Sequence, residues 1–286
     1  MLRSVYQDVK EAFISGNMII RIIIVNVALY MILALTQALF PTFFNGIFPY
    51  IGLPGNVMEL VYKPWTLLTH MFSHTGFFHM AWNMLILYWF GNIVGDLIGD
   101  KRIAPLYFLG GFTGAVLYIM SFYLLPAVAP RAIGASAAVL SVVFAAVAVA
   151  PDYRVHLLLL GPVKIKFIGL FILFFDLLGA TSQVNAGGHI GHLGGTLFGF
   201  LFVYLLRKGI DLSEWRSILP EKKQRKQRKL RVEYKAPVLD RKKNVIKPSS
   251  PLEDEIDRIL EKIKQQGYDN LTVEEKETLY KASEKY

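Results

Sequence analysis

Six long runs of apolar residues dominate the first two thirds of the chain, and polar residues dominate the remainder. A helix that crosses a bilayer needs about 20 consecutive, mostly apolar residues, and each run comes close to that length. The pattern therefore predicts an all-α, polytopic membrane protein with a bundle of six transmembrane helices. The predicted spans are residues 18–40, 77–98, 103–125, 134–150, 165–180 and 188–206.

The composition supports a membrane protein followed by a solvated extension. Of the 286 residues, 53% are hydrophobic and 19% are charged, and the mean hydropathy is +0.40. Residues 1–206 hold 10 Lys/Arg and 7 Asp/Glu, whereas residues 207–286 hold 21 and 15. Because the chain has no cysteine, disulfides, thiolate catalysis and Cys-ligated metal centres are excluded.

The distribution of basic residues predicts the orientation, because loops rich in Lys and Arg stay on the cytoplasmic side. With the N-terminus inside, the opposite side keeps only Lys63 and Arg131. Both termini are therefore expected to be cytoplasmic. The cytoplasmic side then collects the whole tail together with Arg3, Lys10, Arg21, Lys101, Arg102, Arg154, Lys164 and Lys166.

We expect four parts along the chain. Residues 1–17 form a cytoplasmic segment, 18–207 the membrane domain, 208–250 a basic linker and 251–286 a small cytoplasmic helical hairpin. Two capping-box patterns, Ser250 with Glu253 and Thr272 with Glu275, predict the starts of the two tail helices. Seven basic residues between positions 222 and 231 either contact anionic lipid headgroups or form a solvated positive-inside anchor, and nucleic acid is not an expected partner.

Polar side chains inside the spans are costly, so each is a functional candidate. His79, Asn83, Ser136 and His189 all fall near the outer ends of predicted spans, and the topology places them at one depth. His79 and Asn83 are four residues apart and share a helix face. They either donate hydrogen bonds to a developing oxyanion or form an ordinary interhelical pair.

Ser136 follows a glycine turn at the start of a predicted helix, where a hydroxyl is exposed and the helix dipole favours negative charge. It suits a nucleophile and also suits a plain cap residue. His189 opens the sixth span and could accept the serine proton, or donate to a backbone carbonyl instead. Small residues along the fourth and sixth spans allow these two helices to approach closely.

The motifs together resemble the rhomboid intramembrane serine proteases over roughly residues 18–206. The resemblance is carried by Trp65-Thr66-Leu67-Leu68-Thr69-His70 with His74, His79-x-x-x-Asn83, Gly99-Asp100-Lys101-Arg102, Gly134-Ala135-Ser136 and His189 in a glycine-rich span. It implies a six-helix fold and a Ser–His dyad that cleaves transmembrane segments of other proteins. Ser136 would be the nucleophile, His189 the general base, and His79 and Asn83 the oxyanion donors, with no cofactor or metal.

Several positions depart from the family pattern or stand outside it. Ala137 replaces the usual glycine after the serine, Thr66 replaces the common arginine of the first loop, and Gly95 takes the place of an acidic residue. His192, one turn after His189, either tunes the basicity of His189 or only packs. Asp176, inside the fifth span, is expected to hydrogen-bond a neighbour or to stay protonated rather than to act in catalysis.

Two other functions stay open at this stage. His70-x-x-x-His74 and His189-x-x-His192 resemble the histidine boxes of membrane metalloenzymes, since imidazole is a common metal ligand. A catalytically inactive relative that binds transmembrane segments is the other alternative. The short six-span form suggests a bacterial inner membrane as the location.

Overall fold

The computed structural model describes residues 2–126, 128–157, 161–182, 185–214 and 251–283. The chain divides into two compact units, Met1–Gln224 and Arg225–Tyr286. Most of the predicted basic linker, including the basic run at 222–231 and Ser250, lies outside the described residues.

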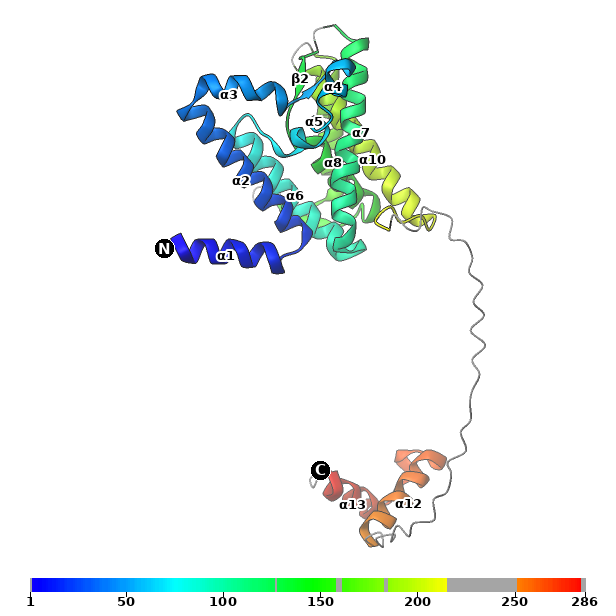
Figure 1. The fold of residues 1–286 in the computed structure, drawn as a ribbon. Coiled ribbons are helices and arrows are strands. Elements are labelled where there is room, and N and C mark those ends of the chain that lie inside the picture. Colours follow the sequence, from blue (N-terminus) through cyan, green and yellow to red (C-terminus); the bar gives the residue numbers. More distant parts are fainter. Residues whose placement is uncertain (1, 127, 158–160, 183–184, 215–250, 284–286) are drawn as a thin grey trace, which may run out of the picture. The chain divides into compact units, whose positions relative to one another are not determined.

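Each of the six apolar runs contains one long helix (Figure 1). Three described helical segments are long and apolar enough to cross a membrane: Met18–Leu39, Asp100–Leu124 and Ala186–Arg207. Ser136–Val149 is a shorter apolar helix. The count of six spans therefore stays a prediction. The six helices are α2 (Met18–Leu39), α6 (Phe77–Ile98), α7 (Ile103–Leu124), α8 (Ser136–Val149), α9 (Ile165–Ala180) and α10 (Ala186–Arg207).

Shorter elements fill the connections. Before α2 lies the helix α1 (Leu2–Ser15), and Arg21 donates to the Phe13 and Ile14 carbonyls at its end. Between α2 and α6 lie α3 (Pro41–Ile47), η1 (Phe48–Tyr50), α4 (Val57–Tyr62), α5 (Thr66–Thr69) and η2 (His70–Phe72), and η3 (Asp100–Arg102) precedes α7. Two small antiparallel sheets pair β1 (Leu53–Pro54) with β2 (Arg131–Ala132), and β3 (Arg154–Leu157) with β4 (Gly161–Lys164). The fold is thus helical with two short strand pairs, which the all-α prediction did not include.

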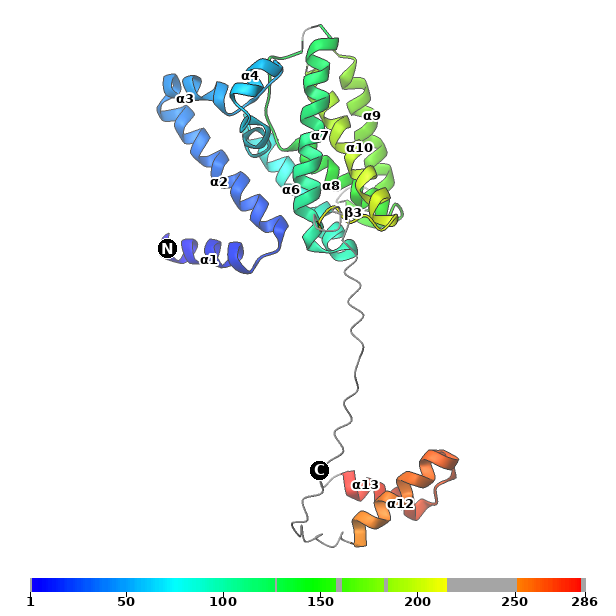
Figure 2. The same ribbon diagram turned by 45° about the vertical axis from the view of Figure 1, so that its right-hand side comes forward.

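Helix α8 lies side by side with α7 and α10 in the core of the first unit (Figures 1 and 2). Glycines on α10 allow its backbone to come close to the backbone of α8. A Cβ added at Gly195 would lie 2.0 Å from the Ala137 carbonyl oxygen, and one at Gly199 would lie 2.4 Å from that of Ser141. The backbones of α8 and α10 are therefore in direct contact, as the small residues along the fourth and sixth predicted spans indicated.

The second unit is a pair of helices joined by a short turn. α12 (Pro251–Gln266) leads through η4 (Tyr268–Asn270) to α13 (Val273–Ser283). Glu275 and Thr272 form the reciprocal hydrogen bonds of the predicted capping box. Lys262 on α12 donates to Glu275 at 2.8 Å, which ties the two helices together.

Candidate active site

Two histidines from the connection between α2 and α6, His70 and His74, hold the backbone that leads into Ser136. Gly134 has φ +133°, a conformation that L side chains rarely adopt, and its N–H donates to the His70 carbonyl at 2.9 Å. The Ala135 N–H donates to Nε2 of His74 at 3.4 Å. These bonds fix the turn from which α8 begins at Ser136.

The loop histidines themselves are buried and bound to backbone groups. Nδ1 of His70 donates to the Thr66 carbonyl at 2.8 Å, and both rings are about 5% exposed. Burial lowers the pKa of His70 and of His74 to about 4. Both are therefore neutral near pH 7, as the hydrogen bond accepted by His74 requires.

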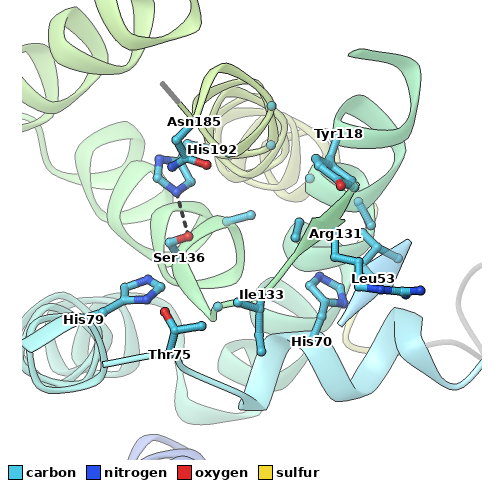
Figure 3. Close-up of a pocket in the computed structure, with 18 residues that line it drawn as sticks. Leu53, His70, Thr75, His79, Tyr118, Arg131, Ile133, Ser136, Asn185 and His192 are labelled. Carbon is cyan, nitrogen blue, oxygen red and sulfur yellow. Dashed lines mark hydrogen bonds between the residues drawn. The ribbon is translucent and has the colours of Figure 1, made fainter. Parts of the chain in front are cut away.

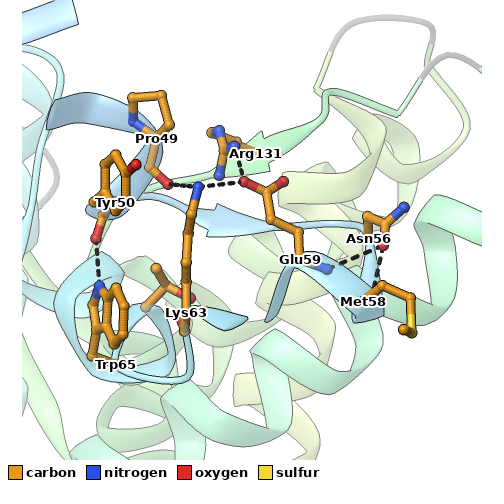
Figure 4. A network of polar contacts seen from close by, with 9 residues as sticks. Pro49, Tyr50, Asn56, Met58, Glu59, Lys63, Trp65 and Arg131 are labelled. Atoms are coloured by element: carbon orange, nitrogen blue, oxygen red, sulfur yellow. Dashed lines mark hydrogen bonds and ion pairs between the residues drawn. The ribbon is translucent and has the colours of Figure 1, made fainter. Parts of the chain in front are cut away.

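A polar network supports the same segment at strand β2 (Figure 4). Glu59 of α4 accepts from Arg131, and Lys63 lies 2.8 Å from the same carboxylate. The Arg131 and Lys63 contacts hold the pKa of Glu59 below its ordinary value. The loop between α2 and α6 is thus linked by an ion pair to the strand that precedes the serine.

Ser136 is paired with His192. The distance from the Ser136 Oγ to Nε2 of His192 is 2.6 Å, and Figure 3 shows the two side chains pointing at each other. His189 instead contacts Asp176, with 2.8 Å between its Nδ1 and Oδ1. The structure thus brings His192, rather than the expected His189, to the hydroxyl of Ser136.

The helical period explains why His192 rather than His189 contacts Ser136. Successive residues on an α-helix turn by about 100°, so His192 lies close to the face that carries Gly195 and Gly199, whereas His189 is rotated away from it. That face is the one that contacts α8. The spacing of three and seven residues from His192 to the two glycines is the signal in the sequence, and it can be used only once the packing of these glycines against α8 is known.

Asp176 of α9 joins the two histidines of α10. Its Oδ1 lies 2.8 Å from Nδ1 of His189 and 2.8 Å from Nδ1 of His192. Because a carboxylate only accepts hydrogen bonds, both Nδ1 atoms carry hydrogens. Nε2 of a neutral His192 is then the acceptor for the Ser136 hydroxyl. Asp176 thus bonds neighbouring side chains, as the sequence suggested.

His79 lies beside Ser136, and Asn83 lies further along the same helix. A Cβ added at Gly134 would meet the His79 ring at 2.7 Å and Oγ of Ser136 at 3.8 Å. Figure 3 shows His79 and His192 on opposite sides of Ser136. Asn83 is 6% exposed and donates through Nδ2 to the His79 carbonyl at 2.8 Å, an intrahelical bond that the sequence analysis did not foresee.

These groups surround a cavity of about 510 Å³. Its lining includes Ser136, His192, His79 and two glycines of the first turn of α10, Gly187 and Gly188. Asn83 is absent from the described residues that line it. The lining comes from β1, η2, α6, α7, β2, α8 and α10 and from the loops between them, and it includes Leu53, His70, Thr75, His79, Tyr118, Arg131, Ser136, Asn185 and His192.

One group of side chains has the composition of a metal site. Asp176, His189 and His192 place one ligand atom each within 4.8 Å of the others. No other such group is found in the part of the chain that the structure describes, so there no third ligand joins His70 and His74, the first pair of the histidine-box alternative.

Two parts of the chain match known protein families. A model described as the Rhomboid domain matches residues 62–209, which is half of the chain and holds Ser136, His192, His79 and Asn83. The chain belongs to the rhomboid family. Membership makes it a membrane-embedded, multi-pass protein. Residues 240–285, which include α12 and α13, match a family of unknown function, DUF6576.

Curated relatives of this rhomboid come from mitochondria and from a bacterium. RHOMBOID-like protein 12, mitochondrial, of Arabidopsis thaliana is 27% identical over 50% of this chain and 47% of its own length. Rhomboid protease GluP of Bacillus subtilis is 32% identical over 47% of this chain and 25% of its own. The mouse presenilin-associated rhomboid-like protein, mitochondrial, is 28% identical over 48% and 37%. The chain thus spans about half or less of the length of these relatives.

Proposed function

We propose that this rhomboid is an intramembrane serine endopeptidase in which Ser136 is the nucleophile and His192 the general base. The observation that carries the proposal is the 2.6 Å contact between Oγ of Ser136 and Nε2 of His192, both of which line the cavity. A serine hydroxyl needs such a base to attack at neutral pH. The similarity to a rhomboid protease supports the same chemistry.

The reaction follows from the geometry. The Ser136 oxygen bonds to the carbonyl carbon of the substrate while its proton passes to Nε2 of His192. The carbonyl π electrons move to the oxygen. These electrons re-form the C=O bond as the C–N bond breaks, and His192 gives the proton to the leaving amine. Water then attacks the acyl-enzyme and gives a proton to Nε2 of His192, which passes it to Oγ of Ser136 as the acyl group leaves.

We propose that His79, the Ser136 N–H and Asn83 stabilise the oxyanion. The first N–H groups of a helix lack intrahelical acceptors, so the one at Ser136 can face the developing charge. The His79 ring lies next to Gly134 on the other side of the serine. A carboxamide carries two hydrogens, so Asn83 can bond the His79 carbonyl and still donate to a substrate.

The substrate class in this proposal is the transmembrane segment of another protein, unwound locally at the cleaved bond. Helix α9 is the proposed side of entry, because its phenylalanines are about half exposed: Phe167, Phe171, Phe174 and Phe175. Six spans with both termini in the cytoplasm, in a bacterial inner membrane, complete the proposal. The basic linker would then face anionic lipid.

The test uses the full chain in proteoliposomes with a reporter that carries one transmembrane segment. Ser136→Ala and His192→Ala should abolish cleavage and labelling by a fluorophosphonate. Ser141→Ala is the matched control on the same helix, since Oγ of Ser141 donates to the Leu106 carbonyl instead of contacting a histidine. Cleavage that persists in Ser136→Ala contradicts the proposal.

The metalloenzyme alternative retains one observation in its favour, the donor set of Asp176, His189 and His192. It predicts that chelators abolish activity and that Ser136→Ala does not. The inactive-binder alternative predicts reporter binding without cleavage by the unmodified chain. The same assay therefore separates all three.

A further inference from the structure

Asp176 stands out from the rest of α9. The side chains of its neighbours Phe175 and Leu177 are each about half exposed, whereas Asp176 is 5% exposed. A buried carboxylate in an apolar helix costs free energy unless it is hydrogen-bonded. Its only bonds among the described residues run to the two histidines of α10.

We propose that Asp176 is a positioning residue that fixes His192 in the tautomer and orientation needed to accept the Ser136 proton. The inference rests on the proposed function and adds a third hydrogen-bonded residue, Asp176, to the dyad of Ser136 and His192. Neutral imidazole has one donor and one acceptor nitrogen. With Nδ1–H held by Asp176, the lone pair of Nε2 points at Oγ of Ser136.

The carboxylate also acts when charge develops. As Oγ of Ser136 bonds to the substrate carbon, its proton moves to Nε2 and His192 becomes an imidazolium. That cation forms 2.8 Å from Oδ1 of Asp176, in surroundings where opposite charges attract more strongly than in water. The ion pair exists only after proton transfer, so it stabilises the transition state more than the resting enzyme.

His189 holds the carboxylate in place. Its Nδ1–H donates to the same Oδ1, and its ring packs directly on Gly179 of α9, where a Cβ would lie 2.4 Å away. Oδ2 of Asp176 has no partner in the part of the chain that the structure describes. Two donors on one oxygen therefore determine the rotamer of the carboxylate that His192 meets.

The measurement is kcat and KM for the transmembrane reporter, made with the full chain in proteoliposomes. We expect Asp176→Asn to lower kcat by about 10²- to 10⁴-fold, as loss of the tautomer does in a Ser–His–Asp site, with little change in KM. Asp176→Glu should restore part of the activity. Asp152→Asn is the matched control, because Asp152 is an exposed carboxylate paired with Lys164 and Lys166.

A purely structural role for Asp176 predicts a different result. If the bonds only join α9 to α10, activity should follow the thermal unfolding midpoint, and Asp176→Leu should cleave normally once folded. His189→Gln, which keeps an N–H donor, and His189→Leu, which removes it, provide a second test. We expect the leucine variant to have the lower kcat of the two, at equal unfolding midpoints.

The possible failures are distinguishable. Full kcat in Asp176→Asn, with Ser136→Ala and His192→Ala inactive, overturns this inference and leaves the proposed function intact. Cleavage by Ser136→Ala overturns both. Loss of wild-type activity on chelation, reversed by Zn²⁺, also overturns the inference, because Asp176, His189 and His192 would then be metal ligands.

Discussion

Two histidine pairs of similar spacing lie on different elements of this rhomboid. The loop pair, His70 and His74, bonds to backbone groups of Thr66 and Ala135. The helix pair, His189 and His192, bonds to the side chains of Asp176 and Ser136. Identical side chains thus have different partners, because one pair bonds main-chain groups and the other bonds side chains.

Burial separates the pairs further. The loop pair is about 5% exposed, whereas the side chains of His189 and His192 are 28% and 23% exposed. His70 and His192 both line the cavity, but Nδ1 of His70 bonds the Thr66 carbonyl, whereas Nε2 of His192 meets the Ser136 hydroxyl. The partner of each nitrogen, rather than the presence of a histidine, indicates the role.

The largest expected effect is at His192. His192→Ala should reduce cleavage by about 10⁶-fold, as removal of the general base does when nucleophile and base act as one unit. His74→Gln, measured in the same reporter assay, should retain most of the activity because glutamine can still accept from Ala135. Equal losses of cleavage activity in the two variants would show that the loop pair and the helix pair do not differ in role.

Removing the hydrogen bond between Ala135 and His74 should lower the stability of the fold more than the rate of cleavage. His74→Ala leaves the Ala135 N–H without its imidazole acceptor, a loss worth about 1–3 kcal/mol when the group is buried, and the 3.4 Å length places it near the lower end. The thermal unfolding midpoint in detergent measures the effect. An unchanged midpoint would show that this hydrogen bond is dispensable.

Lowering the pH should reduce the contribution of the loop pair, His70 and His74, to the stability of the fold. The pKa of each loop histidine is about 4 in the folded protein and about 6.5 in an unfolded chain, so the unfolded state binds more protons between these values. Stability should therefore fall as the pH drops from about 6.5 to 4 and depend no further on the pair below that. Unfolding midpoints of the wild type and of His70→Gln across this range check the slope, which the variant should reduce.

The smallest expected effect is at Glu59, which contacts the same segment through Arg131 at the other end of the turn. Glu59→Gln should lower stability by at most about 1 kcal/mol, because the ion pair is partly exposed and screened by salt. Unfolding in low and high salt measures it. A larger loss than that of His74→Ala would mean that the ion pair, not the loop pair, holds the segment.

Much of the framework was predictable from local sequence. Each apolar run contains a helix whose ends lie within two residues of the prediction, because apolar length and helix signals are local. Ser136 begins its helix directly after the turn at Gly134, as the pattern indicated. The helix α1 and the strand pairs were missed, since short elements depend on contacts made elsewhere.

The choice between His189 and His192 required the tertiary structure. Both histidines lie on one turn of α10, and only the packing of Gly195 and Gly199 against α8 decides which of them faces Ser136. The role of Asp176 was equally inaccessible, because α9 meets α10 through side chains that are 13 and 16 residues apart in sequence.

The sequence by itself determined which chemical groups this protein carries and on which helices they lie, because side-chain identity and helical period are local properties. The tertiary structure alone decided which of those groups touch. A hydrogen bond requires its atoms to lie within about 3 Å, and a rotation of one helix by less than a quarter turn exchanges one histidine for another. The helix contacts that fix this rotation join residues far apart in the chain.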